Sequence, residues 1–259
     1  LFAHLGVLGV AWLRIASAAL IFAAWRRPWR VLRRAGRETF VLVLLLGACL
    51  AAMNSIFYLA ISRLPLGLVA AIEFVGTIAV ALFGLRSLRN HLALACAAFG
   101  VLLLTELRWT SDALGLAFAV LNGVLFVAYI LLGHRLSRHG AGSSIDRLGL
   151  AMLAALAFVM PIGVGQAAAA FTAPMLLLAG IGVGISSSVI PYVCDQLAMR
   201  RLPRNSYALM LAILPATATL IGALVLAQIP TLRDLAGIGL VMLGVALHQQ
   251  DTIDAERGS

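Results

Sequence analysis

Long apolar runs recur along the whole chain, and no other feature constrains its fold as strongly. The stretch LGLVAAIEFVGTIAVALFG at 66–84, for example, contains a single charged residue. A run of 18 or more such residues is long enough to cross a hydrocarbon core about 30 Å thick as an α-helix. The 259 residues are 63% hydrophobic, with a mean hydropathy of +1.05. The sequence therefore predicts an all-α polytopic membrane protein, since the runs lack the alternation of a transmembrane β-barrel.

Nine spans are predicted, joined by links too short to hold a soluble domain. They cover 7–25, 39–61, 66–85, 91–106, 113–133, 148–170, 174–197, 206–227 and 235–248.

The basic residues are distributed unevenly between the links. All nineteen are arginine, and the absence of lysine excludes a P-loop lysine and a Schiff-base lysine. Cytoplasmic links are typically basic, so this pattern places the C-terminus inside and Leu1 outside, and we expect one further span upstream. The net charge of +9 is therefore an orienting feature and does not indicate nucleic-acid binding. Fifteen arginines lie in alternate links or the tail: Arg26, Arg27, Arg30, Arg33, Arg34, Arg37, Arg86, Arg89, Arg135, Arg138, Arg147, Arg200, Arg201, Arg204 and Arg257.

An internal repeat accompanies this pattern. YLAISRLP at 58–65 matches QLAMRRLP at 196–203 at five of eight positions, with an offset of 138. The first copy ends a span that runs outward, whereas the second ends a span that runs inward. We therefore predict two inverted five-span repeats, a common construction of secondary transporters. The predicted division is 1–109 (incomplete, four spans), 110–248 (five spans) and a cytoplasmic tail at 249–259.

Three segments resemble a known family: LFAHLGVLGVAWLRIASAALIFAAWRRPWR at 1–30, MNSIFYLAISRLPLGLVAAIEFVGTIAVALFG at 53–84 and SSVIPYVCDQLAMRRLPRNSYALMLAILPA at 187–216. They are similar to EamA-type transporters of the drug/metabolite transporter superfamily, most of all to the threonine/homoserine exporter group of the bacterial inner membrane. The resemblance implies ten spans in a 5+5 arrangement. The group usually has glutamate before the proline at 215, where this chain has Leu214. This leaves Glu73 as the main candidate for a coupling carboxylate, with Asp195 second.

Charged residues inside the predicted spans are the first candidates for a site, because they are rare in membranes and usually functional. Arg14, Asn54 and Glu73 each lie seven residues from the outer end of their span, which is about 10 Å deep at the helical rise. We infer that Arg14 and Glu73 can pair. Two interpretations stay open. The pair is a fixed structural element, or Glu73 binds a substrate amine or a proton while Arg14 is its alternating partner or the clamp of a carboxylate.

Uncharged polar residues within the spans complete the predicted site. Tyr58 shares a helix face with Asn54, and Asn122 lies in the middle of 113–133. A serine run precedes Pro191, whose missing N–H is expected to interrupt its span and free a carbonyl. The predicted substrate- or proton-binding residues are Glu73, Arg14, Asn54, Tyr58, Asn122, Ser187 and Tyr192.

These features favour a secondary transporter of the bacterial inner membrane. We expect export of a small polar metabolite, such as an amino acid, by alternating access driven by protons. Export of cationic drugs or other metabolites is the alternative. An intramembrane enzyme is a remote alternative, because HExxH and GxSG are absent, and a membrane sensor is another, because no feature favours it. No cofactor or metal is predicted. The expected partners are a small-molecule substrate and the lipid bilayer, without nucleic acid, and the protein is expected to be a monomer or homodimer.

Overall fold

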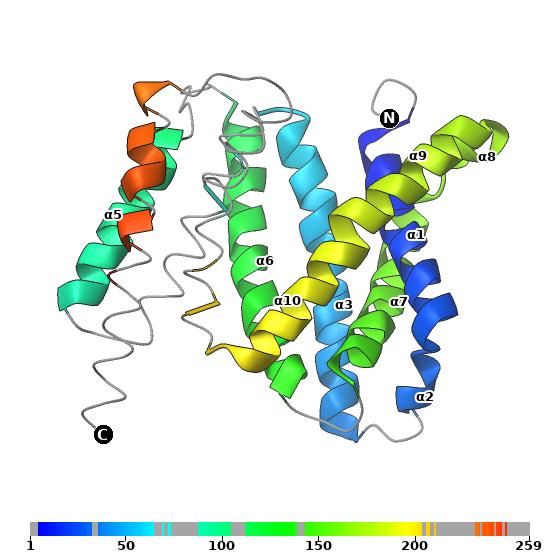
Figure 1. Ribbon diagram of the computed structural model, residues 1–259. Coiled ribbons are helices and arrows are strands. Elements are labelled where there is room, and N and C mark those ends of the chain that lie inside the picture. The colour runs from blue at the N-terminus through cyan, green and yellow to red at the C-terminus, as the bar shows by residue number, and fades with distance from the viewer. Residues whose placement is uncertain are drawn as a thin grey trace. The chain divides into compact units, whose positions relative to one another are not determined.

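A computed structural model describes residues 5–32, 36–64, 69, 72–73, 88–104, 112–138, 143–203, 206–207, 210, 231–233, 235–240, 242–244 and 247. Helices dominate these residues, and no strand occurs among them. The elements are α1 (Val7–Arg26), α2 (Trp29–Leu32), α3 (Arg37–Ile61), α5 (Leu88–Leu104), α6 (Ala113–Arg138), α7 (Ser144–Gly163), α8 (Ala168–Thr172), α9 (Pro174–Gly184), the π-helix η1 (Ile185–Val189) and α10 (Ile190–Arg201) (Figure 1).

Five described helices are long and apolar enough to cross a membrane: α1, α3, α6, α7 and the continuous helix Pro174–Arg201. They match the predicted spans at 7–25, 39–61, 113–133 and 174–197, and α7 overlaps the predicted span at 148–170. Two shorter apolar helices, His91–Gly100 and Leu235–Gly244, fall within the predicted spans 91–106 and 235–248. The predicted spans 66–85 and 206–227 lie largely outside the described residues. The chain is therefore a polytopic helical membrane protein.

The predicted span 148–170 is wrong at both ends. The helix begins earlier, because the Ser143 hydroxyl accepts a hydrogen bond from the backbone N–H of Ile145 (3.3 Å) and so caps its first turn. It ends at Gly163, and a turn then leads to the short helix α8. The apolar run QAAAAF at 166–171 extended the predicted span, because hydropathy does not register a change of direction.

Pro191 does not interrupt its span, contrary to the prediction. α9, η1 and α10 form one helix from Pro174 to Arg201, and the proline is the second residue of α10. The turn before it is a π-helix, Ile185–Val189. Local π-turns commonly accommodate a proline or a functional side chain without ending a helix.

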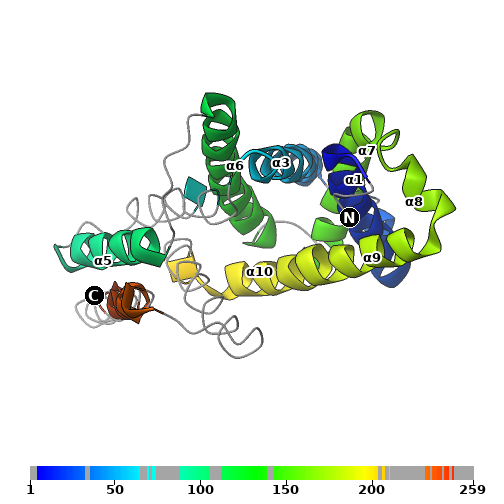
Figure 2. The ribbon, with the colours of Figure 1, turned by 90° about the horizontal axis from the view of Figure 1, so that it is seen from above.

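The chain divides into two compact units, the first formed by residues 1–63 with 128–201 and the second by 64–127 with 202–259. In the first unit α7 packs against α1 and α3, and α1 also packs against α9 and η1 (Figures 1 and 2). In the second unit a Cβ added at Gly244 would lie 2.5 Å from the Ala93 carbonyl oxygen, so the helix at 242–244 lies close to α5.

Small residues mark the helix crossings of the first unit. A Cβ added at Gly47 of α3 would lie 2.6 Å from Ala154 of α7, and one added at Gly163 of α7 would lie 2.5 Å from Trp12 of α1. Gly180 and Gly184 are both buried, and an added Cβ at Gly184 would overlap the Ser17 hydroxyl of α1. Because lipid provides little hydrophobic drive between helices, such close approaches supply the packing energy.

Candidate functional site

Arg14 of α1 is held by the π-helix. Its Nε donates to the Ser188 hydroxyl oxygen (2.8 Å), and its Nη2 donates to the Ser187 carbonyl oxygen (2.5 Å). Its Cζ lies 6.0 Å from the centroid of the Tyr58 ring of α3, a distance compatible with a cation–π contact. Three elements that are far apart in sequence thus position one guanidinium.

Pro191 removes the regular α-helical donor to the Ser187 carbonyl. In a regular helix the carbonyl of residue 187 would accept from the N–H of residue 191, and proline has none. The Arg14 guanidinium donates to that oxygen instead. The predicted freeing of a carbonyl by Pro191 is therefore supported, although the predicted break in the helix is wrong.

Neutral groups surround Arg14. The described partners of Arg14 in the first unit are a hydroxyl, a carbonyl and an aromatic ring, and no described carboxylate of that unit bonds to it. These contacts orient the guanidinium without cancelling its charge. They use two of its five N–H donors, so Arg14 keeps both the charge and the donors with which to bind a carboxylate.

A chain of polar and aromatic groups continues from this point. Asn54, which is 2% exposed, donates through Nδ2 to the Leu50 carbonyl (2.8 Å) and to the Tyr192 hydroxyl (3.2 Å). The Tyr192 and Tyr129 ring centroids are 5.5 Å apart, and the Tyr129 hydroxyl donates to Asp195 Oδ2 (2.8 Å). The sequence placed Asn54 and Tyr192 in the site and named Asp195 as the second candidate for a coupling carboxylate, whereas Tyr129 is not among the predicted binding residues.

Gln196 is a residue that the sequence did not suggest. It is wholly buried, and neither amide atom has a hydrogen-bond partner among the described residues. α6 approaches Gln196 closely at Gly133, where an added Cβ would lie 3.3 Å from Nε2 of the Gln196 side chain. A buried polar group without a partner is unusual, which makes Gln196 a candidate for contact with the substrate. Two features of the sequence could have identified Gln196. It lies 138 residues after Tyr58, which is the repeat offset, and it shares a helix face with Tyr192, four residues before it.

Glu73 and Asn122 form the polar centre of the second unit. Asn122 is wholly buried and donates through Nδ2 to Glu73 Oε2 (2.7 Å). An amide donor stabilises a carboxylate in its charged form. The other amide atom, Asn122 Oδ1, is buried with no hydrogen-bond partner among the described residues. A carboxylate next to an unused acceptor suits a ligand that donates hydrogen bonds, such as an ammonium group.

The seven predicted residues thus fall into two groups. Arg14, Asn54, Tyr58, Ser187 and Tyr192 come together in the first unit, and Glu73 and Asn122 come together in the second. Ser187 contributes its carbonyl, and the hydroxyl that binds Arg14 belongs to Ser188. Because Arg14 and Glu73 belong to different units, their ion pair stays a prediction. Among the described residues no three His, Cys, Asp or Glu side chains form a group that could hold a metal ion.

Comparison with known proteins decides the family. The model of the EamA-like transporter family matches residues 113–248. The threonine/homoserine exporter RhtA of Escherichia coli strain K12 is 34% identical over 245 residues, which are 93% of this chain and 81% of that exporter. The chain belongs to the EamA-like transporter family. RhtA of Salmonella typhimurium strain LT2 is likewise 34% identical over 246 residues, 94% of this chain and 80% of RhtA. This EamA-like chain is therefore a membrane transporter and not an enzyme, as the sequence predicted.

A solved crystal structure supports the fold of this EamA-like transporter. It shares 17% sequence identity, with a TM-score of 0.66, and the match covers 93% of this chain and 86% of that one. At this identity the likeness bears on the fold alone.

Proposed function

We propose that this EamA-like transporter exports small amino acids, such as threonine and homoserine, from the bacterial cytoplasm. It works by alternating access and exchanges substrate for protons. One observation carries the proposal: Arg14 is held within the apolar helices by neutral partners, so its charge is kept for a ligand. The similarity to exporters named for threonine and homoserine supports this choice of substrate.

The proposed roles follow from the donors and acceptors at each group. Arg14 binds the substrate carboxylate, because guanidinium matches a carboxylate in charge and geometry. Glu73, in the second unit, takes up the coupling proton, and its hydrogen bond from the Asn122 amide favours the charged carboxylate that this proton neutralises. A purely cationic drug would use Glu73 and find no role for Arg14, so the zwitterion is the better candidate.

Alternating access is proposed because the chain carries the marks of an inverted repeat. α1 and α7 are both 20 residues long and begin at residues 7 and 144. Two of the three boundaries between the units, those after residues 63 and 201, differ by 138, the offset of the repeated octapeptide.

Asn54 and Tyr192 are also 138 apart, and they share a hydrogen bond. Equivalent positions of two repeats touch only near the axis that relates them. This contact, with the family match to 113–248, supports repeats at 1–109 and 110–248. A cytoplasmic tail at 249–259 is part of the same proposal.

Transport into inverted membrane vesicles tests the proposal. In such vesicles an exporter carries substrate into the lumen, and a proton antiporter needs an acidic lumen. We expect uptake of labelled threonine and homoserine above that of vesicles lacking the protein, and we expect the excess to vanish when the pH gradient is collapsed. Glu73→Gln should lose the dependence on the gradient. Glu38→Gln is the matched control, because Glu38 is 72% exposed at the start of α3.

The outcomes separate the parts of the proposal. Wild-type uptake equal to that of vesicles lacking the protein would rule out these two amino acids as substrates. Uptake that persists without a pH gradient would retain amino-acid export and remove proton coupling. Loss of gradient dependence in both carboxylate variants would show that Glu73 has no special role.

A further inference from the structure

A cleft of about 510 Å³ lies where α1 ends and α2 begins, in the first unit. Its charged lining consists of Arg26, Arg27 and Arg30, with Asp146 from the first turn of α7. Three guanidinium groups and one carboxylate leave it with a formal charge of +2. None of the residues proposed to bind the amino acid lines it, so it is a separate site.

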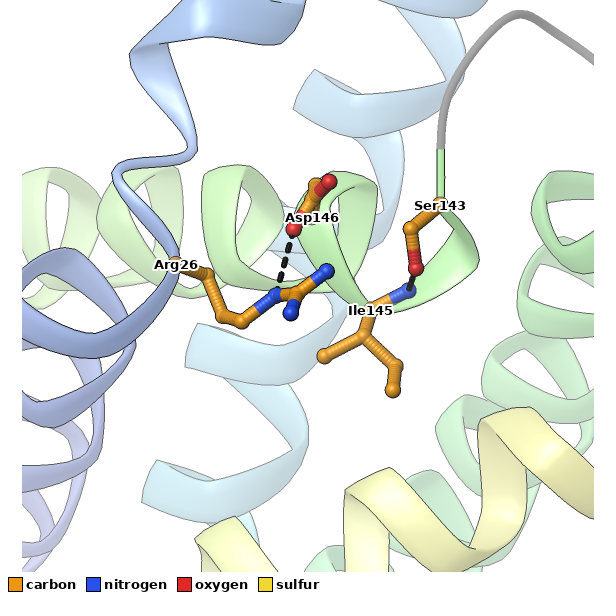
Figure 3. A network of polar contacts seen from close by, with 4 residues as sticks. All are labelled: Arg26, Ser143, Ile145 and Asp146. Atoms are coloured by element: carbon orange, nitrogen blue, oxygen red, sulfur yellow. Dashed lines mark hydrogen bonds and ion pairs between the residues drawn. The ribbon is translucent and has the colours of Figure 1, made fainter.

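Asp146 orients Arg26 in the cleft. Asp146 Oδ1 accepts from Arg26 Nε (2.7 Å), which leaves both terminal nitrogens of Arg26 unbonded in this network (Figure 3). The Ser143 cap on the Ile145 N–H fixes the turn that carries Asp146 (Figure 3). The Trp25 ring centroid lies 5.4 Å from Arg26 Cζ and supports it from another side.

The other two arginines have no partner of this kind. Both are exposed, and among the described residues neither Arg27 nor Arg30 forms an ion pair or a side-chain hydrogen bond. Arg27 adopts φ 48° and ψ 56°, the left-handed region that favours glycine. This turn directs the chain from α1 into α2 and so brings three arginines to one cleft.

The flanking side chains indicate the depth of the cleft. Trp25 is 56% exposed and Trp29 is 48% exposed, next to the end of an apolar spanning helix. Exposed tryptophan is typical of the membrane–water interface, where lipid headgroups lie. At that level the phosphate groups of anionic lipids attract basic side chains.

We propose that this cleft binds the phosphodiester headgroup of an anionic phospholipid. The terminal nitrogens of Arg26 and the guanidinium groups of Arg27 and Arg30 hold the phosphate oxygens, and the two tryptophans lie against the glycerol and upper acyl region. The inference is independent of the substrate that the transporter carries.

Titration of the delipidated full chain, followed by native mass spectrometry, tests the site. The probes are phosphatidylglycerol, phosphatidylcholine and inorganic phosphate. We expect phosphatidylglycerol to stay bound and phosphatidylcholine to bind weakly. Inorganic phosphate at an equimolar concentration should not displace the bound phosphatidylglycerol. Each arginine removed should weaken phosphatidylglycerol binding about fivefold, and the pair Arg27→Gly with Arg30→Gln about thirtyfold.

The variants separate binding from folding. Arg27→Gly removes the guanidinium but suits the left-handed backbone, so its melting temperature should not fall. Arg201→Gln is the matched control, an exposed arginine at the end of α10 outside the cleft, and it should change binding less than twofold. Equal binding of the two lipids, equal losses in Arg201→Gln and Arg30→Gln, or displacement by equimolar phosphate would each overturn the proposal.

Discussion

At the scale of single residues, the hydroxyl of Ser188 is the group that fixes the orientation of Arg14. Hydrogen bonds to charged groups contribute about 1.5–3 kcal/mol, which corresponds to roughly a tenfold to hundredfold effect. We predict that Ser188→Ala lowers the transport efficiency for threonine by at least about tenfold. The measurement is the initial rate of labelled threonine uptake in inverted vesicles at matched protein levels.

Two neighbouring serines provide the controls for that prediction. The exposed Ser186 hydroxyl donates to the Gly182 carbonyl (2.9 Å), and Ser187 contacts Arg14 through its backbone carbonyl. Ser186→Ala and Ser187→Ala should both transport at close to the wild-type rate. Equal losses in all three variants would show that the π-helix, and not the Ser188 hydroxyl, is what matters.

Gln196 leads to a second prediction at this scale. A buried polar group without a partner costs about 1–3 kcal/mol, so Gln196→Leu should raise the melting temperature of the purified protein. If the amide contacts the substrate or its water, threonine transport should fall in the same variant. A melting temperature below that of the wild type would instead indicate that Gln196 is satisfied in the folded protein.

The residues of the site differ in how readily the sequence identifies them. Arg14 and Glu73 were recognisable because a charge in an apolar span is costly and conspicuous. Gln196 was not, because a polar residue near two arginines at a helix end resembles an ordinary interfacial residue. The choice of Ser188 over Ser187 depends on the local π-turn, which alters the direction of each side chain and has no hydropathy signature.

At the scale of the helices, the crossing of α1 and α9 depends on Gly180 and Gly184, which contact Leu13 and Ser17 of α1. An added Cβ at Gly184 would overlap the Ser17 hydroxyl, whereas one at Gly182 would meet nothing within 4 Å. We predict that Gly184→Ala destabilises the protein by about 1–3 kcal/mol, the usual range for overpacking. Thermal unfolding in detergent measures it, and Gly182→Ala should cause no loss. The packing assigned to this crossing would be wrong if both variants unfolded at the same temperature.

The helices themselves were largely predictable, because each span is a continuous apolar run of membrane length. α3 was predicted as 39–61 and runs from Arg37 to Ile61. The errors occur where local backbone chemistry, and not hydropathy, determines where a helix ends or whether it continues. The Ser143 cap and the turn after Gly163 give α7 an earlier start and an earlier end than predicted. The π-turn before Pro191 leaves the helix Pro174–Arg201 continuous.

At the scale of the whole molecule, the proposed inverted repeat makes a prediction about topology. If the two halves are inverted repeats, the links after residues 63 and 201 are equivalent and lie on opposite sides of the membrane. We expect an alkaline phosphatase fusion after Arg63 to be active in the periplasm and a green fluorescent protein fusion after Arg201 to be fluorescent in the cytoplasm. The exchanged fusions should both be silent. Fusions that report the same side for both links would refute the inversion.

The central claim is that Arg14 recognises the carboxylate of an amino acid, and transport of threonine compared with threonine amide tests it most directly. The amide keeps the ammonium and hydroxyl groups and loses only the carboxylate charge. We predict that the wild-type protein transports threonine much faster than the amide, that Arg14→Gln abolishes threonine transport, and that Arg14→Lys restores part of it. Equal transport of the two compounds by the wild type, or unchanged threonine transport by Arg14→Gln, would contradict the account.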